Sequence, residues 1–316
     1  MKNKKILIGV LCAAIAEIFY GFSYLFTKNI TNSVSPLTLL SWRFIIAFII
    51  LNICVLLHII KVNFKNKSII SLISVAIFQP VLYIIGETFG IKLTSASESG
   101  TILACIPIVT LLFSALLLKE PPTKLQVIGV GITAIGIITI VVVKGIEATF
   151  NPIGYTMLML AVVSYSLYSV FAQKAEEFTS AEKTYAMMAF GTVVFTIIGL
   201  TENVISGTLK DFIFLPFTNG EFLIAALFLG IGGSVITFFL CNIAIASIGT
   251  NRAASFVGIS TIVSVIAGVI ILNEEFSIVQ ICGTALVIGG VYLANIMIES
   301  KKEEIENYQE KKVENG

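Results

Sequence analysis

TSASESGTILACIPIVTLLFSALLLKEPPTKLQVIGVGITAIGIITIV, residues 94–141, decides the fold of this chain. It is two apolar segments joined by a short charged turn, and a similar arrangement returns 154 positions later. When Glu120 is laid on Glu274, the alignment needs no gap. The matched pairs are Thr101 with Ser255, Thr123 with Ser277, Gln126 with Gln280, Gly129 with Gly283, and Gly136 with Gly290. The sequence therefore predicts two copies of one design.

The turn in each copy has the features of a helix start. Glu120 and Glu274 place negative charge where it suits the positive end of a helix dipole. An S/T-x-x-Q capping box, which satisfies free amides at a helix N-terminus, directly precedes each following apolar run. The two boxes are Thr123 with Gln126, and Ser277 with Gln280. We expect both turns to be helix boundaries.

The composition is that of a membrane protein, because 57% of the 316 residues are hydrophobic and only 12% are charged. An average soluble domain has about a quarter charged residues. A bilayer crossing needs about 20 apolar residues in a helix. Ten such runs predict an all-α protein with ten transmembrane helices: 6–26, 37–60, 69–89, 101–118, 125–143, 153–171, 185–200, 222–246, 253–272 and 278–298.

Catalytic and nucleic-acid-binding motifs are missing from the sequence. The chain has one histidine, His58, and one aspartate, Asp211, so the groupings of membrane metallopeptidases or acyltransferases are absent. No basic stripe suggests nucleic acid. We expect no catalytic residue, metal site or cofactor.

The placement of lysine and arginine predicts the orientation. With the N-terminus inside, fifteen of these residues fall in inner segments and four in outer segments, an excess that favours cytoplasmic termini. Five helices per copy is an odd number, so the second repeat, residues 149–298, is inverted relative to the first, residues 1–148. A charged cytoplasmic tail, residues 299–316, follows. Inverted repeats are typical of secondary transporters, whose substrate site lies near the membrane midplane.

The first helix carries Glu17, Tyr20 and Tyr24 on one face. An acidic side chain halfway through a bilayer helix costs a few kcal/mol unless it faces protein or water. We therefore expect Glu17 to face inward. Two roles stay open, a contact to protons, cations or a substrate amine, and a buried structural carboxylate paired with a neighbour.

Arg43 of the second helix has two interpretations. It can extend to the outer interface beside Trp42, or pair with Glu17, Glu87 or Glu98. The pair is the favoured interpretation, because several acids lie at a similar depth. Glu98 lies within a serine-rich start of the fourth helix and is interpreted as helix-start electrostatics. The alternative is an outer gate made with Lys92, Arg43 and Glu87.

The third helix places Gln79, Tyr83 and Glu87 four residues apart on one stripe. Pro80 removes a backbone hydrogen bond and should bend this helix, as Pro107 should bend the fourth. Bends in membrane helices often line cavities, although packing alone can produce them.

The second half repeats the tyrosines without the charges. Tyr165 and Tyr168 align with Tyr20 and the small polar residues of the first helix at an offset of 145. Asn242 of the eighth helix suits a polar cavity wall, with ordinary interhelical hydrogen bonding as the alternative.

These patterns resemble the EamA family of the drug/metabolite transporter superfamily. The similarity rests on residues 94–120 and on GTNRAASFVGISTIVSVIAGVIILNEE, residues 249–275, each followed by Q-x-x-G-x(6)-G. It covers residues 1–298 and implies ten helices around a central cavity. It also implies movement of small metabolites, often outward and in many members with proton exchange. Within it, Glu120 and Glu274 look structural. Thr261 departs from the resemblance, because it stands where proline is expected opposite Pro107.

The sequence thus predicts a secondary transporter in the cytoplasmic membrane that exports small amphipathic metabolites such as amino acids or amines. The expected partners are the lipid bilayer, a small-molecule substrate and protons, and the protein is a monomer or a homodimer. Efflux of drugs or toxic compounds is the alternative, followed by a membrane receptor or enzyme. The expected pathway residues are Glu17, Tyr20, Tyr24, Arg43, Gln79, Tyr83, Glu87, Tyr165, Tyr168 and Asn242, and the structural residues are Pro80, Pro107, Glu120 and Glu274.

Overall fold

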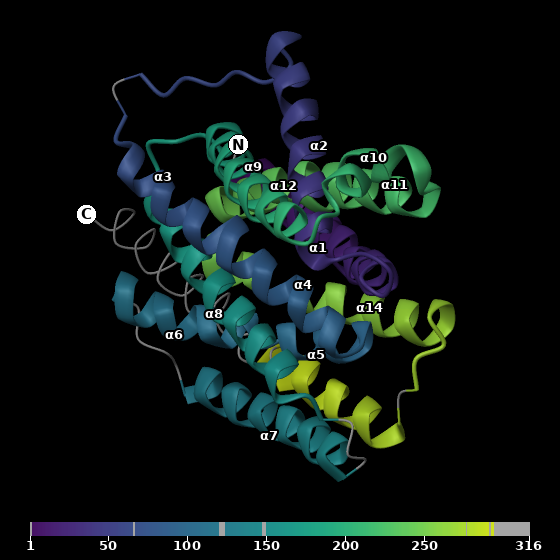
Figure 1. The fold of residues 1–316 in the computed structure, drawn as a ribbon. Coiled ribbons are helices and arrows are strands. Elements are labelled where there is room, and N and C mark those ends of the chain that lie inside the picture. Colours follow the sequence, from purple (N-terminus) through teal and green to yellow (C-terminus); the bar gives the residue numbers. More distant parts are fainter. Residues whose placement is uncertain are drawn as a thin grey trace, which may run out of the picture.

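The computed structural model describes residues 2–65, 67–119, 124–146, 150–275, 277–290 and 292–293, and these residues form helices and no strand (Figure 1). The helices before residue 147 are α1 (Lys2–Ile30), α2 (Pro36–Leu56), α3 (Ile69–Ala76), the π-helical η1 (Ile77–Leu82), α4 (Tyr83–Leu93), α5 (Ala96–Leu103), α6 (Ile106–Leu118) and α7 (Lys124–Ile146). Those after residue 151 are α8 (Pro152–Lys174), α9 (Ser180–Ile205), α10 (Leu209–Thr218), α11 (Gly220–Leu227), the π-helical η2 (Phe228–Ile236), α12 (Thr237–Ile248), α13 (Thr250–Ala254) and α14 (Val257–Ile271).

Eight helical stretches are long and apolar enough to cross a membrane. Four are single helices, α1, α2, α8 and α9, and four join consecutive elements over residues 69–93, 96–118, 220–248 and 250–271. Two more apolar helical stretches, Val127–Ile140 and Ile278–Gly290, are shorter. The all-helical membrane class is confirmed, while the count of ten spans in two inverted repeats remains a prediction.

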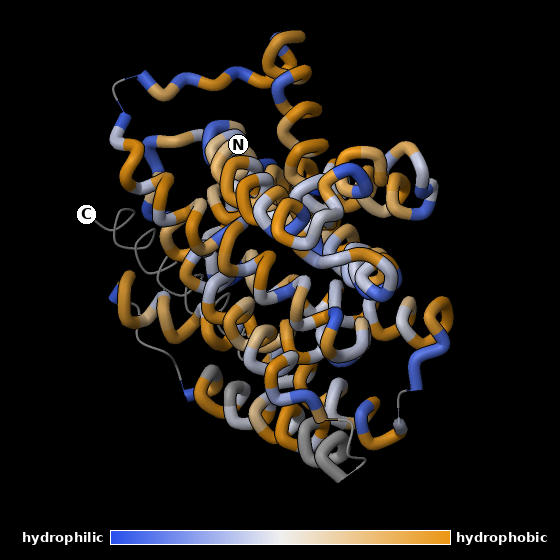
Figure 2. Tube along the Cα trace, in the orientation of Figure 1, coloured by the Kyte–Doolittle hydropathy of each residue, from blue (hydrophilic) through white to orange (hydrophobic). Residues whose placement is uncertain are grey.

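The surface and interior have the polarity expected in lipid. Large apolar side chains point outward, among them Leu116 at 74% and Ile205 at 80% exposure, whereas Glu17, Arg43 and Glu87 are buried. In Figure 2 the hydrophobic colour dominates along the helices, and the hydrophilic colour gathers at connections and helix ends. Because lipid cannot solvate charge, charged groups in the middle of spans must face protein or water.

The bends predicted at the two prolines are confirmed. Pro80 lies in η1, where Gln79 has extended backbone angles (φ −140°, ψ 120°) and the Gln79–Pro80 peptide is cis. Pro107 lies in the first turn of α6, just after the break from α5. The second half is also interrupted, by η2 and between α13 and α14, although no proline lies at those positions.

Helices from the two halves of the chain are interleaved. α1 packs on α12 and α14, and α8 packs reciprocally on α4 and α6. α2 packs on α9, and α5 packs on α14, which lies beside it in Figure 1. Lys119 and Asn273, which the repeat aligns, both have left-handed backbone, with φ of 61° and 53°. The packing agrees with an internal repeat, whose boundaries at residues 148 and 298 remain predictions.

One of the two predicted capping boxes lies within the described residues. The capping box of Ser277 and Gln280 is confirmed, because the Ser277 amide donates to Gln280 Oε1 at 2.8 Å and the Gln280 amide donates to Ser277 Oγ at 3.3 Å. Glu120, Thr123 and the tail 299–316 lie outside the described residues. The segment between the seventh and eighth predicted spans contains a further helix, α10, which the apolar runs do not predict.

Candidate functional site

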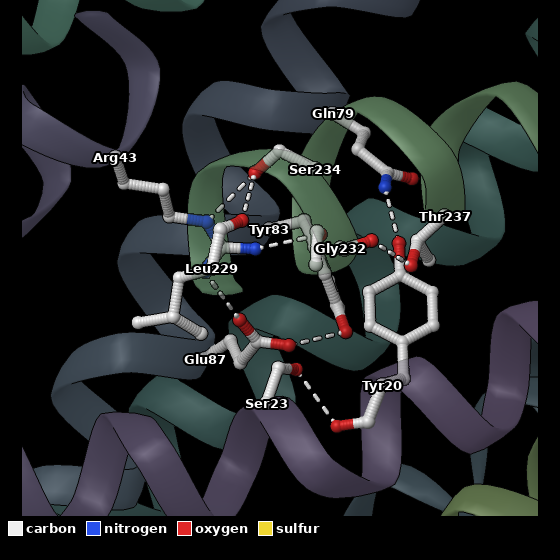
Figure 3. Close-up of polar contacts among 11 residues, drawn as sticks. Tyr20, Ser23, Arg43, Gln79, Tyr83, Glu87, Leu229, Gly232, Ser234 and Thr237 are labelled. Carbon is white, nitrogen blue, oxygen red and sulfur yellow. Dashed lines mark hydrogen bonds and ion pairs between the residues drawn. The ribbon is translucent and has the colours of Figure 1, made fainter. Parts of the chain in front are cut away.

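A buried polar cluster lies where α1, α2, η1, α4, α8 and the η2–α12 span meet (Figure 3). Both halves of the chain contribute to it, since Tyr20, Arg43 and Glu87 come from the first and Ser234 from the second. All four side chains are at most 1% exposed. A polar centre surrounded by apolar spans is the arrangement expected of a membrane protein that handles a polar solute.

Arg43 is the charged centre of this cluster. Its Nε donates to Ser234 Oγ at 2.8 Å and its Nη2 donates to the Gly233 carbonyl at 2.9 Å, both in η2. Its Nη1 lies 3.7 Å from Glu87 Oε2. The interpretation of Arg43 as an interfacial side chain is therefore wrong, and of the three acids considered as partners, Glu87 forms the pair. Planar Arg suits this role because its donors point in several fixed directions.

Glu87 links the ion pair to the tyrosines. Its Oε1 accepts a hydrogen bond from Tyr83 Oη at 2.7 Å, and its Oε2 forms no hydrogen bond within the described part of the chain. Because one turn of helix separates Tyr83 from Glu87, α4 aligns both on the same side. The pair leaves one carboxylate oxygen available to a further donor.

Gln79 is brought into the cluster by the irregular backbone of η1. Its Nε2 donates to Tyr20 Oη at 2.7 Å, while its Oε1 has no hydrogen-bond partner among the described residues. Gln79, Tyr83 and Glu87 therefore lie together as predicted, although the helix between them is not regular. π-helical segments are frequent at functional sites, and both η1 and η2 border this cluster.

Four tyrosine rings stand edge to face beside the ion pair. The ring centroids of Tyr83 and Tyr165 are 5.3 Å apart, those of Tyr20 and Tyr83 6.0 Å, those of Tyr20 and Tyr165 6.3 Å, and those of Tyr165 and Tyr168 5.5 Å. The structure thus brings together tyrosines from α1, α4 and α8. Such rings present a negative face that attracts cations.

Glu17 lies on the α14 side of α1. It is 3% exposed and interacts with Ser260. Tyr24, two turns further along the same face of α1, interacts with Ser260 and Tyr83. No basic side chain in the described ranges forms an ion pair with Glu17. The inward orientation predicted for Glu17 is confirmed, and Arg43 is not its partner.

Asn242 forms a second polar connection at the end of the tyrosine row. Its Oδ1 accepts from Tyr168 Oη at 3.1 Å, and its Nδ2 donates to Thr184 Oγ1 at 3.1 Å. Cys241 beside it accepts from Tyr165 Oη, with 3.6 Å between the sulfur and the oxygen. Sequence reasoning missed Thr184, because the predicted seventh span began one residue later than this threonine. The helix starts at Ser180.

Glu274, which was expected beside the helix that follows it, caps a different helix. Its carboxylate accepts from the backbone amides of Ala96 and Ser97 at the start of α5. Glu98 lies in the first turn of the same helix, as predicted, and forms a capping box there with Ser95. Within the described ranges, no group of three His, Cys, Asp or Glu side chains has the arrangement of a metal site.

The fold and this cluster define a multi-pass membrane protein with a polar centre between its spans. The sequence matches the EamA-like transporter family over residues 7–142 and again over residues 152–296. The chain therefore belongs to the EamA-like transporter family.

Individual proteins similar to this chain are also named as transporters. The uncharacterized transporter YcxC of Bacillus subtilis is 35% identical over 295 residues, which cover 92% of this chain and 94% of that protein. An uncharacterized transporter of Archaeoglobus fulgidus is 24% identical over 89% of this chain and 96% of that protein. A solved crystal structure with 20% sequence identity matches with a TM-score of 0.62, over 93% of this chain and 96% of that chain, and shows the fold alone. Together these similarities support a membrane transporter rather than an enzyme.

Proposed function

We propose that this protein is a secondary transporter of the cytoplasmic membrane that exports small amphipathic metabolites such as amino acids or amines. The observation that carries the proposal is the buried cluster of Figure 3, in which side chains from both halves meet. Relative movement of the halves would open the cluster alternately to the two sides of the membrane. In many other secondary transporters the substrate site also lies at the interface of the repeats, which move relative to each other during transport.

The charges of the cluster favour a substrate with an amino group. Arg43 is engaged by Ser234, Gly233 and Glu87, so its role is to join α2 to η2. Among the side chains of the cluster, the atoms without a hydrogen bond to another described residue are two acceptors, Gln79 Oε1 and Glu87 Oε2, and one donor, Arg43 Nη1, which faces Glu87. An ammonium group donates hydrogen bonds to such oxygens and is attracted by tyrosine faces.

Glu17 is proposed as the coupling group. It lies in α1 close to the tyrosines, and no basic side chain of the described ranges neutralises it. A carboxyl group that exchanges a proton for a substrate ammonium ion would link substrate movement to the proton gradient. In this scheme Tyr20, Tyr24, Tyr165, Tyr168 and Asn242 line the path, and Pro80 and Pro107 shape it.

Efflux of larger apolar cations is the second candidate. The four edge-to-face tyrosines offer aromatic surface with few directional donors, which suits aromatic or quaternary amines. Both candidates place the termini in the cytoplasm and the two repeats in opposite orientations. The reciprocal packing of α1 and α8 supports a repeat, and the odd number of predicted spans in each copy supports the inversion. The working unit is a monomer or a homodimer.

Flux measurements with purified protein in liposomes test the proposal. A panel of radiolabelled amino acids and amines is offered with and without a proton gradient, and empty liposomes serve as control. We expect saturable uptake of at least one amine or amino acid that declines when the gradient is collapsed. Saturable binding without flux would instead support a receptor, and flux insensitive to the gradient would remove proton exchange.

A further inference from the structure

α10 carries apolar side chains on two neighbouring sides, of which one is buried and one is exposed. On one side Phe212 is 5% exposed and packs on Trp42, with ring centroids 5.8 Å apart, and the Trp42 indole N–H donates to the Phe212 carbonyl at 3.0 Å. Pro216 on the same side is also buried. This side therefore fixes the helix to α2.

The neighbouring side of α10 is exposed to an increasing degree along the helix. Leu209, Ile213 and Phe217 follow one another at intervals of four and form a stripe along the helix. Their exposures are 36%, 46% and 82%. Leaving apolar surface in water costs about 25 cal/mol per Å², so a stripe of this kind indicates an apolar environment.

The length and the connections of α10 restrict where that environment is. Ten residues of helix extend about 15 Å, roughly half of the hydrocarbon core, so α10 cannot cross the membrane. It follows the last turn of α9 through Gly207, whose φ is +69°, and Asn219 at its end caps α11. Both neighbours are candidate spans. α10 must therefore lie at the membrane surface at which α9 ends and α11 begins.

The turns of the neighbouring spans closest to α10 are apolar and exposed in the same way. Ile205 at the end of α9 is 80% exposed, and Ile224 in α11 is 61% exposed. Beyond the stripe, a hollow of about 520 Å³ is bordered by Lys210, Asp211, Phe214, Leu215, Thr218 and Asn219. The helix thus has an apolar stripe beside a side on which Lys210 and Asp211 accompany the exposed Phe214, and this mixture of charged and apolar groups suits a helix that lies in a lipid interface.

We propose that α10 is an interfacial helix that lies in the plane of the bilayer surface. Leu209, Ile213 and Phe217 enter the acyl-chain region of one leaflet, and Lys210 and Asp211 remain among the headgroups. The lipid leaflet is the partner of this surface. The inference is independent of the substrate and of proton coupling, since it rests on the membrane class and on the exposure of α10.

Tryptophan fluorescence tests the position of α10 in the full-length protein. Trp42 is the only tryptophan of the chain, so Trp42→Phe gives a background that keeps an aromatic ring against Phe212. Phe217→Trp in this background reports on the apolar stripe. Thr218→Trp is the matched control, because Thr218 is the next residue and lies on the same side of α10 as Asp211. Both proteins are reconstituted in liposomes. In one experiment the lipids are brominated near the top of the acyl chain, and in the other iodide is present on both sides of the membrane.

The expected result is opposite quenching of the two variants. Brominated lipid should cause a severalfold larger loss of emission for Phe217→Trp than for Thr218→Trp, and iodide should do the reverse. Equal iodide quenching of both variants would place the stripe in water and overturn the proposal. Protection of Phe217→Trp from both quenchers would also overturn it, because the stripe would then be covered by protein such as a second copy of this chain.

Discussion

Glu274 caps α5 of the first half of the chain through Ser97, whose amide donates to Glu274 Oε2 at 3.0 Å and whose hydroxyl donates to the same oxygen at 2.7 Å. The Ala96 amide donates to Glu274 Oε1 at 2.7 Å. Hydrogen bonds to an ionised carboxylate are stronger than neutral ones, and a negative charge at a helix N-terminus is stabilising. The loop after α14 is thereby joined to the start of α5.

Removing this cap is expected to destabilise the protein. Glu274→Ala should lower the free energy of unfolding by about 1–3 kcal/mol, because buried amides lose their acceptor. The midpoint of thermal unfolding in detergent measures the effect. Glu275→Ala is the matched control, since Glu275 is the next residue and is exposed. Equal midpoints for the two variants would contradict the cap.

Breaking the Arg43–Glu87 pair from one side should cost more than removing both charges. Arg43→Met leaves the buried Glu87 carboxylate without its cation, and such breaks cost about 3–5 kcal/mol. Combining Arg43→Met with Glu87→Gln should recover part of this loss. The comparison is made by thermal unfolding of the two single variants and the double variant. Additive losses would mean that the two side chains are not coupled.

Arg43→Lys is expected to resemble Arg43→Met rather than the wild type. A lysine keeps the charge but has no planar donor group that could bind Ser234, Gly233 and Glu87 together. Folding yield and thermal stability report the loss. A fully stable lysine variant would show that charge alone is required at this position.

Glu17→Gln should abolish transport coupled to protons and leave insertion and folding intact. Glutamine keeps the size and the hydrogen-bonding capacity toward Ser260 but cannot take up or release a proton. Flux in liposomes is compared at equal amounts of inserted protein, with exposed Glu221→Gln as the control. Unchanged dependence of the flux on the proton gradient would remove Glu17 from the mechanism.

Alanine at two helical glycines should have opposite effects. A Cβ at Gly86 would come within 2.6 Å of the Met157 carbonyl oxygen and 2.8 Å of the Ala161 amide, so Gly86→Ala should push α4 and α8 apart and lower stability. A Cβ at Gly131 in α7 meets nothing within 4 Å. Gly131→Ala should therefore stabilise the helix by up to about 1 kcal/mol. The midpoints of thermal unfolding of the two variants show whether each substitution stabilises or destabilises the protein. A Gly86→Ala variant as stable as the wild type would contradict the close approach of α4 and α8.

The sequence could predict the features that depend on local pattern. Apolar runs of bilayer length, the capping box at Ser277 and the bends at Pro80 and Pro107 follow from the order of residues alone, and the structure has them. The inward position of Glu17 follows from the cost of charge in lipid. The breaks at η2 and before α14 were not predictable in this way, because no proline marks them.

By itself the sequence determined that the chain is an all-helical membrane protein, that one pattern returns along it after 154 positions, and which of its residues are too polar to face lipid. These properties depend on composition and on spacing along the chain. Only the tertiary structure decided that Glu87 pairs with Arg43, that Glu274 caps α5, and that α10 packs on Trp42. Those contacts join residues that are far apart in the sequence, so the packing of whole helices selects among partners that are equally polar.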